Sequence, residues 1–165
     1  MTPAAGLVFD AGPVRDLLAA MPYQNKVGIR VEAVVSDGID LLLPFDPQNL
    51  AVPDVLSAGV AFILGETAGG AILWGLFPPA DFALVARRVD IRYLRPSCGA
   101  LRVRPRVADL RWETTLEALR AGGRGRVTVP LTVLGEDERP VARIEAQYTL
   151  WRRAVAEGPR SPAAG

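Results

Sequence analysis

The stretch LSAGVAFILGETAGGAILWGLF, residues 56–77, decides the fold. Its only ionisable side chain is Glu66, which lies near the middle with small residues on either side. Ser57 is a suitable N-cap, and Pro78 ends a helix because proline cannot donate the next backbone hydrogen bond. The helix between them would be about 30 Å long. A helix of that length that is apolar on nearly all sides is buried, either inside a protein or in a membrane.

The same run could be a membrane span. Its length suffices, and Gly65 and Gly69 match the close-packing motif of membrane helix pairs. However, its flanks carry Asp54 and Asp81 instead of lysine or arginine, five glycines dilute its hydrophobicity, and Glu66 lies where a charge is most costly in a bilayer. We therefore expect the core helix of a globular domain, with no membrane as a partner.

One face of this helix combines the acid with glycine. At roughly 100° per residue, that face contains Gly59, Phe62, Ile63, Glu66, Gly69, Gly70 and Leu73. Glycine inside a helix costs about 0.5–1 kcal/mol relative to alanine, and it is tolerated where a ligand or another backbone comes close. We expect Glu66 to face such an approach surface; the alternatives are a structural acid hydrogen-bonded to neighbouring helix ends, or an exposed residue.

The composition excludes several function classes. The chain has 165 residues, 50% of them hydrophobic, which fits one globular domain. Its net charge of +1 gives no global field that would attract nucleic acid. Histidine is absent and Cys98 is the only cysteine, which excludes a disulfide framework, zinc sites built on Cys and His, and histidine-dependent triads within one chain. We expect no metal and no cofactor.

Residues 12–43 are predicted to form a short helix and a β-hairpin. Apolar side chains recur at helical spacing over residues 12–21, until Pro22 stops the helix. The odd positions of residues 27–35 are apolar, as in a half-buried strand, and residues 39–43 form the return strand after the turn signal Asp37-Gly38. A proline-rich loop then leads into the central helix.

Residues 85–150 are predicted to add four strands. The odd positions from Val85 to Tyr93, Arg87 among them, share one face of the first strand. Pro130 indicates an edge or a bulge in the third strand. The strands cover residues 85–93, 101–107, 127–133 and 142–150, with a short helix around residues 115–120. Antiparallel strands with one dry face can wrap a single helix, which predicts an α+β fold.

The ends of the chain are predicted to lie outside this domain. Residues 1–11 are interpreted as a loose N-terminus, residues 12–153 as the domain, and residues 154–165 as a disordered tail. The N-terminal stretch lacks the basic region and the continuous apolar region of a signal peptide, so we expect the cytoplasm.

Several motifs occur together around the helix. The asparagine of PQN, Asn49, precedes LSAG; the helix reads LSAGVAFILGETAGGA; and the turn RYLRPSCG is followed by a basic strand. With the order of two strands, a helix and four strands, residues 22–153 resemble the hotdog-fold thioesterase superfamily, and within it the PaaI-like and DUF4442-type members. The resemblance implies an antiparallel sheet wrapped around one long helix, and an acyl-CoA thioesterase that forms a homodimer or a dimer of dimers.

The resemblance also implies a site shared by two subunits. In such enzymes the helix of one subunit opens with a His-Gly-Gly-like turn whose N–H polarises the thioester carbonyl. An acid on the partner's helix acts as general base or nucleophile. Here the opening turn is Ser57-Ala58-Gly59, without the histidine, and the acid is Glu66. Gly59 would stabilise the oxyanion and Asn49 would orient the water or the carbonyl, while Ser57, Ala58 and Gly70 would contact the substrate.

Spacing independently favours two subunits. Gly59 and Glu66 are about 10.5 Å apart along the helix axis. A carbonyl donor and a base must both lie about 3 Å from one reacting carbon, so one helix cannot supply both. Two antiparallel helices across a dimer axis would bring Gly59 of one chain towards Glu66 of the other, twice per dimer. We expect burial to raise the pKa of Glu66.

Seven arginines crowd two predicted strands, and they allow two interpretations. They are Arg87, Arg88, Arg92, Arg95, Arg102, Arg104 and Arg106. One interpretation is a dock for the phosphates of coenzyme A or an acyl carrier protein, with Arg87, Arg88 and Arg95 as candidates. The other is a solvated face paired with Asp90 and Asp109.

Two functions of different classes follow. The first is hydrolysis of acyl-CoA or acyl-carrier thioesters, with coenzyme A as part of the substrate. The alternative is a non-catalytic hotdog protein that binds an acyl or aryl ligand, because the histidine of the opening turn is absent. The related hydratases need a catalytic histidine, which this chain lacks.

Overall fold

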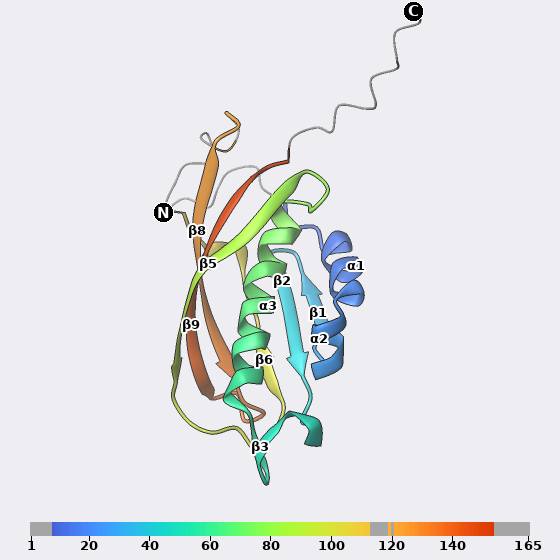
Figure 1. Ribbon diagram of the computed structural model, residues 1–165, viewed down its shortest axis with the longest axis vertical. Coiled ribbons are helices and arrows are strands. Elements are labelled where there is room, and N and C mark those ends of the chain that lie inside the picture. The colour runs from blue at the N-terminus through green and yellow to red at the C-terminus, as the bar shows by residue number, and fades with distance from the viewer. Residues whose placement is uncertain (1–7, 113–118, 120, 154–165) are drawn as a thin grey trace, which may run out of the picture.

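The central helix α3 spans Ala58–Leu76 and lies across the sheet (Figure 1). The computed structural model describes residues 8–112, 119 and 121–153. α3 begins at Ser57, whose Oγ accepts a hydrogen bond from the Gly59 N–H at 3.2 Å. By length and a mean hydropathy of 1.4 this helix could cross a membrane, but 67% of its apolar window is buried inside the domain. It is the core helix, as expected.

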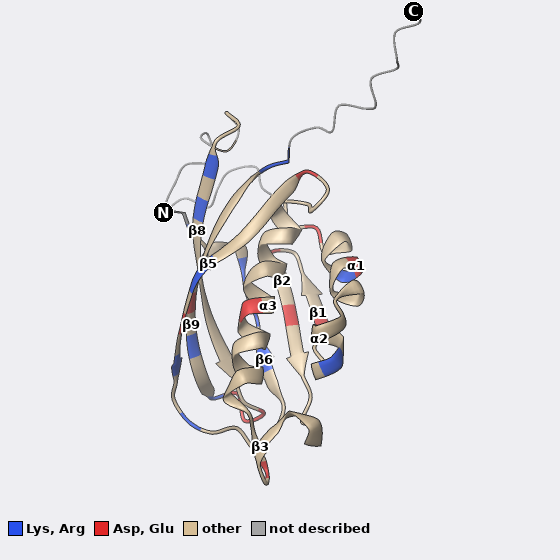
Figure 2. Cartoon of the chain, viewed as in Figure 1, with Lys and Arg blue, Asp and Glu red and all other residues tan. Residues whose placement is uncertain are grey.

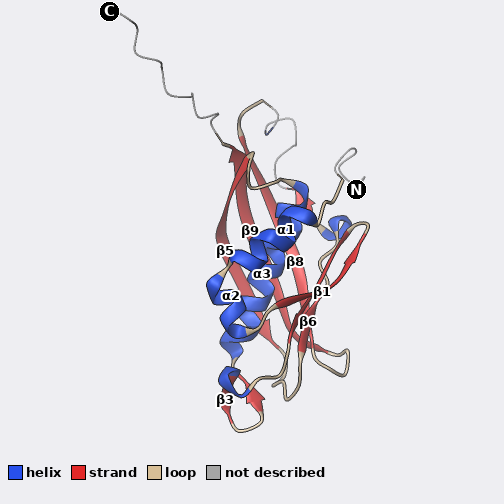
Figure 3. Cartoon of the chain, turned by 90° about the vertical axis from the view of Figure 1, so that its right-hand side faces the viewer, coloured by secondary structure: helices blue, strands red, loops and turns tan. Residues whose placement is uncertain are grey.

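One antiparallel sheet wraps α3 (Figures 1 and 3). The strands are β1 (Arg30–Val35), β2 (Gly38–Leu43), β5 (Phe82–Tyr93), β6 (Leu101–Val103), β7 (Arg111–Trp112), β8 (Arg124–Leu134) and β9 (Pro140–Arg152). Their order is β1-β2-β6-β8-β9-β5, and β7 also pairs with β8. The predicted α+β class with one central helix is confirmed.

Smaller elements complete the domain. Two helices, α1 (Gly12–Ala20) and α2 (Pro22–Val27), lie beside α3 (Figures 1 and 3). The loop before α3 contains the 3-10 helix η1 (Pro47–Asn49) and the short pair β3 (Leu50–Val52) and β4 (Val55–Leu56), and the 3-10 helix η2 (Val107–Asp109) follows β6. The predicted short N-terminal helix is thus confirmed, with a second helix directly after it.

The predicted strand over residues 27–35 is wrong at its start. Val27 is the last residue of α2, and Gly28 ends that helix in a left-handed conformation with φ 86°. Pro22 stops α1 and also provides the first residue of α2, where its fixed φ suits a helix and its missing N–H is not needed. The strand therefore begins only at Arg30.

The predicted face of residues 85–93 is wrong for Val85 and Arg87. The pairing of β5 with β9 shifts by one residue between Ala86 and Arg88, which makes Arg87 a β-bulge. Because a bulge inserts one residue, it reverses the alternation of faces on either side of it. Val85 and Arg87 consequently lie on the outer face of the sheet, where they line a groove with residues of β8 and β9.

Pro130 lies at a local edge, as predicted. It opposes Glu145 of β9 on one side. On the other side of β8, β6 pairs only with Val133 and Leu134, and β7 pairs further back along β8. Pro130 thus lies between the part of β8 that pairs with β6 and the part that pairs with β7, where its missing N–H interrupts no strand pairing.

The ends of the described chain differ from the expectation in part. The Asp10 N–H donates to the Gly75 carbonyl at 2.8 Å, and Phe9 packs against the core, so these two residues are attached to α3. Residues 1–7 of the predicted loose N-terminus lie outside the described residues, and so do the predicted helix around residues 115–120, apart from Leu119, and the predicted tail at residues 154–165.

Candidate functional site

Glu66 lies midway along α3 and is half-buried. In Figure 2, the red that marks Asp and Glu appears at the middle of α3, which carries no other charge colour. Burial raises the pKa of the Glu66 carboxyl above its ordinary value. Among the described residues, its carboxylate forms no ion pair and accepts no hydrogen bond. The carboxylate is therefore available to a ligand, unlike that of a structural acid held between helix ends.

A cavity of about 230 Å³ lies beside Glu66, and we call it the α1 chamber. α1 and the residues after it cover the chamber with Leu17, Leu18, Met21 and Gln24. α3 contributes Glu66, Thr67, Gly70 and Trp74; Leu84 of β5 and Tyr148 of β9 complete the wall. The chamber is mostly apolar, with one carboxylate at its side, as is common in small-molecule sites.

The predicted glycine face of α3 is divided in the structure. Gly59 and Glu66 remain incompletely covered by the rest of the chain, and so does Gly70. Gly69 and Leu73 are instead buried against the sheet. The prediction that they share an approach surface with Glu66 is therefore wrong, because the sheet curls far enough around α3 to cover that edge of the stripe.

Tyr148 is a contact of the Glu66 turn that sequence reasoning missed. Its hydroxyl donates to the Glu66 carbonyl oxygen at 3.0 Å. Burial and the nearby Glu66 charge raise the pKa of Tyr148, so its hydroxyl stays protonated. The signal was present in the alternation of residues 142–150, because a tyrosine on the buried face of a strand needs a partner for its hydroxyl.

The start of α3 leaves one N–H without an acceptor. The Gly59 N–H donates to Ser57 Oγ, and the Val60 N–H donates to the Ser57 carbonyl at 3.1 Å. Ala58 is exposed, and among the described residues no group accepts from its N–H. A helix start carries partial positive charge, so the Ala58 N–H can bind an oxyanion, whereas the Gly59 N–H is already occupied.

Asn49 is buried and connects the end of α2 to the start of α3. Its side-chain amide donates to the Val27 carbonyl at 2.7 Å, and its own carbonyl accepts from the Ser57 N–H at 2.8 Å. It does not line the α1 chamber. The structure thus gives Asn49 a role in positioning the helix start, and its predicted role in catalysis stays a prediction.

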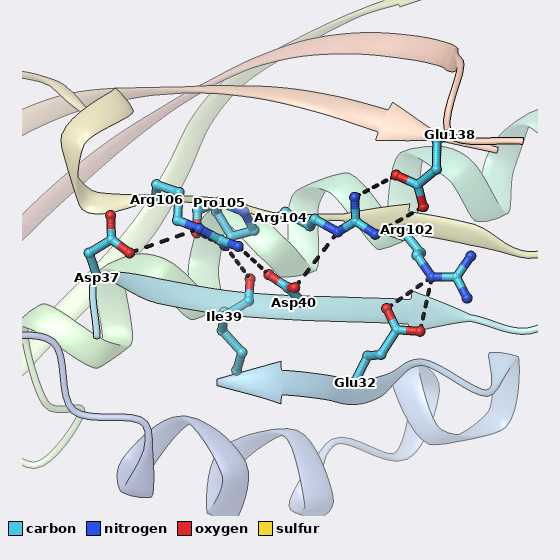
Figure 4. A network of polar contacts seen from close by, with 9 residues as sticks. All are labelled: Glu32, Asp37, Ile39, Asp40, Arg102, Arg104, Pro105, Arg106 and Glu138. Atoms are coloured by element: carbon cyan, nitrogen blue, oxygen red, sulfur yellow. Dashed lines mark hydrogen bonds and ion pairs between the residues drawn. The ribbon is translucent and has the colours of Figure 1, made fainter. Parts of the chain in front are cut away.

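The arginines of β6 and the loop after it are paired with carboxylates (Figure 4). Arg102 contacts Glu32 at 2.9 Å, and Arg106 contacts Asp40 at 2.7 Å. Arg104 donates to Glu138 at 2.9 Å. These three arginines are thus held by carboxylates, but they are half-buried and their partners are not the predicted Asp90 and Asp109.

The three proposed phosphate ligands lie apart from the chamber. Arg88 pairs with Asp90 at 2.7 Å on β5, and Arg95 holds the β8–β9 hairpin through Asp137 and the Pro140 carbonyl. Arg87 forms no ion pair with the described residues and lies on the outer face of the sheet. None of the three lines the α1 chamber, and their role in binding phosphate stays a prediction.

Comparison with known proteins supports the fold. No family model matches this chain, and no curated protein sequence does. Solved structures do match. One is a Pseudomonas aeruginosa protein of unknown function named a probable thioesterase, with 23% identity and a TM-score of 0.69 over 89% of this chain and 99% of that chain. The chain has the hotdog fold. 

Further matches agree with this assignment. A Haemophilus influenzae thioesterase matches at 16% identity with a TM-score of 0.70, over 91% of this chain and 96% of its own. A mutant thioesterase from Pseudomonas aeruginosa matches at 16% identity with a TM-score of 0.69, over 87% and 95%. The predicted resemblance to the hotdog-fold superfamily is confirmed for the fold, while the finer likeness to DUF4442-type members stays a prediction.

Proposed function

We propose that this hotdog protein hydrolyses acyl thioesters of coenzyme A or an acyl carrier, with Glu66 as general base. The observation that carries the proposal is a half-buried carboxylate without an ion pair, with a raised pKa, beside an apolar chamber. A carboxyl group with a raised pKa is suited to exchange protons near neutral pH. Hydrolysis of thioesters is also the activity named for proteins that share the fold.

A dimer would complete this site. β5 has twelve residues and pairs with β9 on one side, while no described strand pairs with its other side. A long free edge of this kind favours pairing with a second copy. Such pairing would lay two α3 helices antiparallel and bring the start of one helix to Glu66 of the other. The helix rise of about 12 Å between Ala58 and Glu66 requires this arrangement if the Ala58 N–H and the Glu66 carboxylate act on one carbonyl.

The chemical steps follow from these groups. Glu66 takes a proton from water, and the water oxygen forms a bond to the thioester carbonyl carbon. The carbonyl oxygen becomes an oxyanion, which the Ala58 N–H of the partner subunit stabilises, a contribution of about 3–4 kcal/mol for a good donor. The C–S bond then breaks, the thiolate leaves, and the proton held by Glu66 passes to the sulfur. Acid and thiol are the products, and Glu66 is regenerated.

This mechanism changes one role assigned from the sequence. The oxyanion donor becomes the Ala58 N–H, because Ser57 already accepts from the Gly59 N–H. Ser57, which stands where the resemblance places a histidine, would act by capping and would hold the helix start in shape. A cytoplasmic location stays part of the proposal.

The test is thiol release from a panel of acyl-CoA substrates. Glu66→Gln keeps the shape of the side chain and removes the base, so turnover should fall by about 10²–10⁴-fold. Asp16→Asn, at an exposed acid of α1 outside the chamber, is the matched control and should keep wild-type turnover. The exposed Cys98 adds a constant thiol background that has to be subtracted. Undiminished turnover in Glu66→Gln would remove Glu66 from the mechanism.

The second candidate is a non-catalytic acyl- or aryl-binding protein. The observation that favours it is the absence of histidine together with a preformed apolar chamber. Calorimetry with the same acyl-CoA panel separates the two functions. Saturable binding without any thiol release supports the binding protein, and release that depends on Glu66 supports the hydrolase.

A further inference from the structure

We propose that the α1 chamber holds the acyl group of the substrate and limits it to one aromatic ring or to a chain of roughly eight carbons. This inference rests on the proposed function, because it takes the substrate to be a thioester whose carbonyl lies at Glu66. The chamber starts at Glu66 and extends under α1, so an acyl group attached to that carbonyl has a direct path into it.

The volume of the chamber sets the limit. A cavity of about 150 Å³ lined by apolar side chains is enough for benzene, and the α1 chamber has about 230 Å³. At about 30 Å³ for one water-sized atom, this space accommodates roughly eight non-hydrogen atoms. Longer acyl chains would have to leave their last carbons outside the chamber or displace α1, which Val14 and Leu18 hold against the core.

The charge of the chamber lining favours the acyl group, and not the phosphates of coenzyme A, as the occupant of the α1 chamber. Among the residues that the structure describes, Glu66 is the only charged one in the lining, and none of the described arginines or Lys26 lines the chamber. A phosphate would be repelled by the carboxylate and would find no cation to pair with. The same repulsion disfavours acyl groups that end in a second carboxylate. Leu17, Met21 and Leu84 provide the apolar contacts that an uncharged acyl group needs.

Gly70 determines how much of the chamber is open. A Cβ placed on Gly70 would meet no atom within 4 Å, and Gly70 lies one helical turn after Glu66. A side chain at this position would occupy the chamber without pushing other residues apart. Gly70→Ala adds one carbon and Gly70→Val adds three, so the two variants reduce the space in steps.

The experiment measures kcat/KM and, separately, binding for acyl-CoA thioesters from acetyl to dodecanoyl, with benzoyl-CoA included. Binding is measured by calorimetry in the Glu66→Gln variant, relative to coenzyme A alone. We expect affinity to rise by about fourfold per methylene until roughly eight carbons and then to level off. Gly70→Ala should move this limit down by about one carbon and Gly70→Val by about three, with acetyl-CoA unaffected.

The controls separate this inference from the proposed function. Ala20→Val, at the exposed end of α1 away from the chamber, should leave the profile unchanged. If hydrolysis occurs but its dependence on acyl length is the same in wild type and Gly70→Val, the chamber assignment is wrong and the proposed hydrolase activity remains supported. A length-dependent affinity that responds to Gly70→Val, without hydrolysis, would support the chamber and overturn the hydrolase. An affinity that does not depend on acyl length in any variant would overturn the chamber assignment.

Discussion

Gly69 and Gly70 are neighbours on α3, yet they face opposite environments. A Cβ on Gly69 would lie 2.5 Å from the Tyr148 hydroxyl oxygen, whereas a Cβ on Gly70 would meet no atom within 4 Å. One side of the helix is therefore closed by packing against β9, and the other side is left open beside Glu66. The same residue type serves close packing at one position and ligand space at the next, and substitutions should separate the two roles.

After Glu66→Gln, the largest effect should follow Ala58→Pro, on the open side at the start of α3. Proline is tolerated at the first position of a helix, and Ser57, with φ −59° and ψ 136°, has a conformation that suits the residue before proline. The substitution removes only the N–H proposed to bind the oxyanion, so kcat should fall by about 10²–10³-fold. Urea denaturation should show unchanged stability. Ala58→Gly keeps the N–H and should keep most of the activity; full activity in Ala58→Pro would exclude this donor.

Gly69→Ala should have the largest effect on stability, on the packed side. Its methyl group would overlap the buried Tyr148 hydroxyl, so the free energy of unfolding should fall by about 1–3 kcal/mol. Adding Tyr148→Phe removes the closest atom and should recover part of that loss. Urea denaturation of the single and double variants measures both. Wild-type stability in Gly69→Ala would contradict the packing described for this side.

The pH dependence of stability and of activity should also report on Glu66, which lies on the open side of α3. Burial raises the pKa of Glu66 above 4.5 in the folded state, so the folded protein binds more protons than the unfolded chain between 4.5 and the raised pKa. The free energy of unfolding should therefore fall as pH rises through that window, and kcat/KM should rise over the same range. Denaturation of Glu66→Gln should show no such step. An identical pH profile in wild type and variant would show that Glu66 is not perturbed.

Gly70→Ala should have a smaller effect of opposite sign to Gly69→Ala. Alanine is favoured over glycine inside a helix by about 0.5–1 kcal/mol, and no atom opposes the added methyl group. The free energy of unfolding should rise by that amount in urea denaturation. A loss of stability similar to that of Gly69→Ala would mean that the chamber is not open at this position.

The smallest expected effect is that of Thr67→Val. The Thr67 hydroxyl is buried and, among the described residues, has no hydrogen-bond partner. Replacing it with a methyl group of similar size removes an unsatisfied polar atom, so the free energy of unfolding should stay equal or rise by up to about 1 kcal/mol. Thermal denaturation suffices to measure it. A clear loss of stability would indicate a partner for this hydroxyl, such as a water molecule.

The fold was predictable where one face of an element is buried along its whole length. Residues 142–150 alternate without interruption, and Ala142, Ile144 and Tyr148 are all buried in β9 as that pattern predicts. β5 was misassigned in its first half, because Arg87 and Arg88 give no polarity difference that would reveal the bulge at Arg87. An exposed arginine fits both a regular strand position and a bulge position, so the sequence does not show where the alternation of faces reverses.

Within the site, only the residue whose charge contrasts with its apolar surroundings was predictable from the sequence. Glu66 was identifiable because a lone carboxylate interrupts an apolar helix. The α1 chamber was not, because Leu17, Met21 and Leu84 resemble ordinary core residues, and an empty space leaves no pattern in a sequence. The N-cap role of Ser57 was predicted, but its consequence for the Gly59 N–H depends on a side-chain rotamer that only the structure provides.

The most direct test of the shared site is complementation between two inactive variants. If the Ala58 N–H of one subunit and Glu66 of the other act on the same thioester, a mixed dimer of Ala58→Pro and Glu66→Gln contains one intact site and one that lacks both groups. Random association of equal amounts makes half of the dimers mixed, so about a quarter of the wild-type activity should return. Activity that remains at the level of the separate variants, with mixed dimers shown to form, would contradict the account.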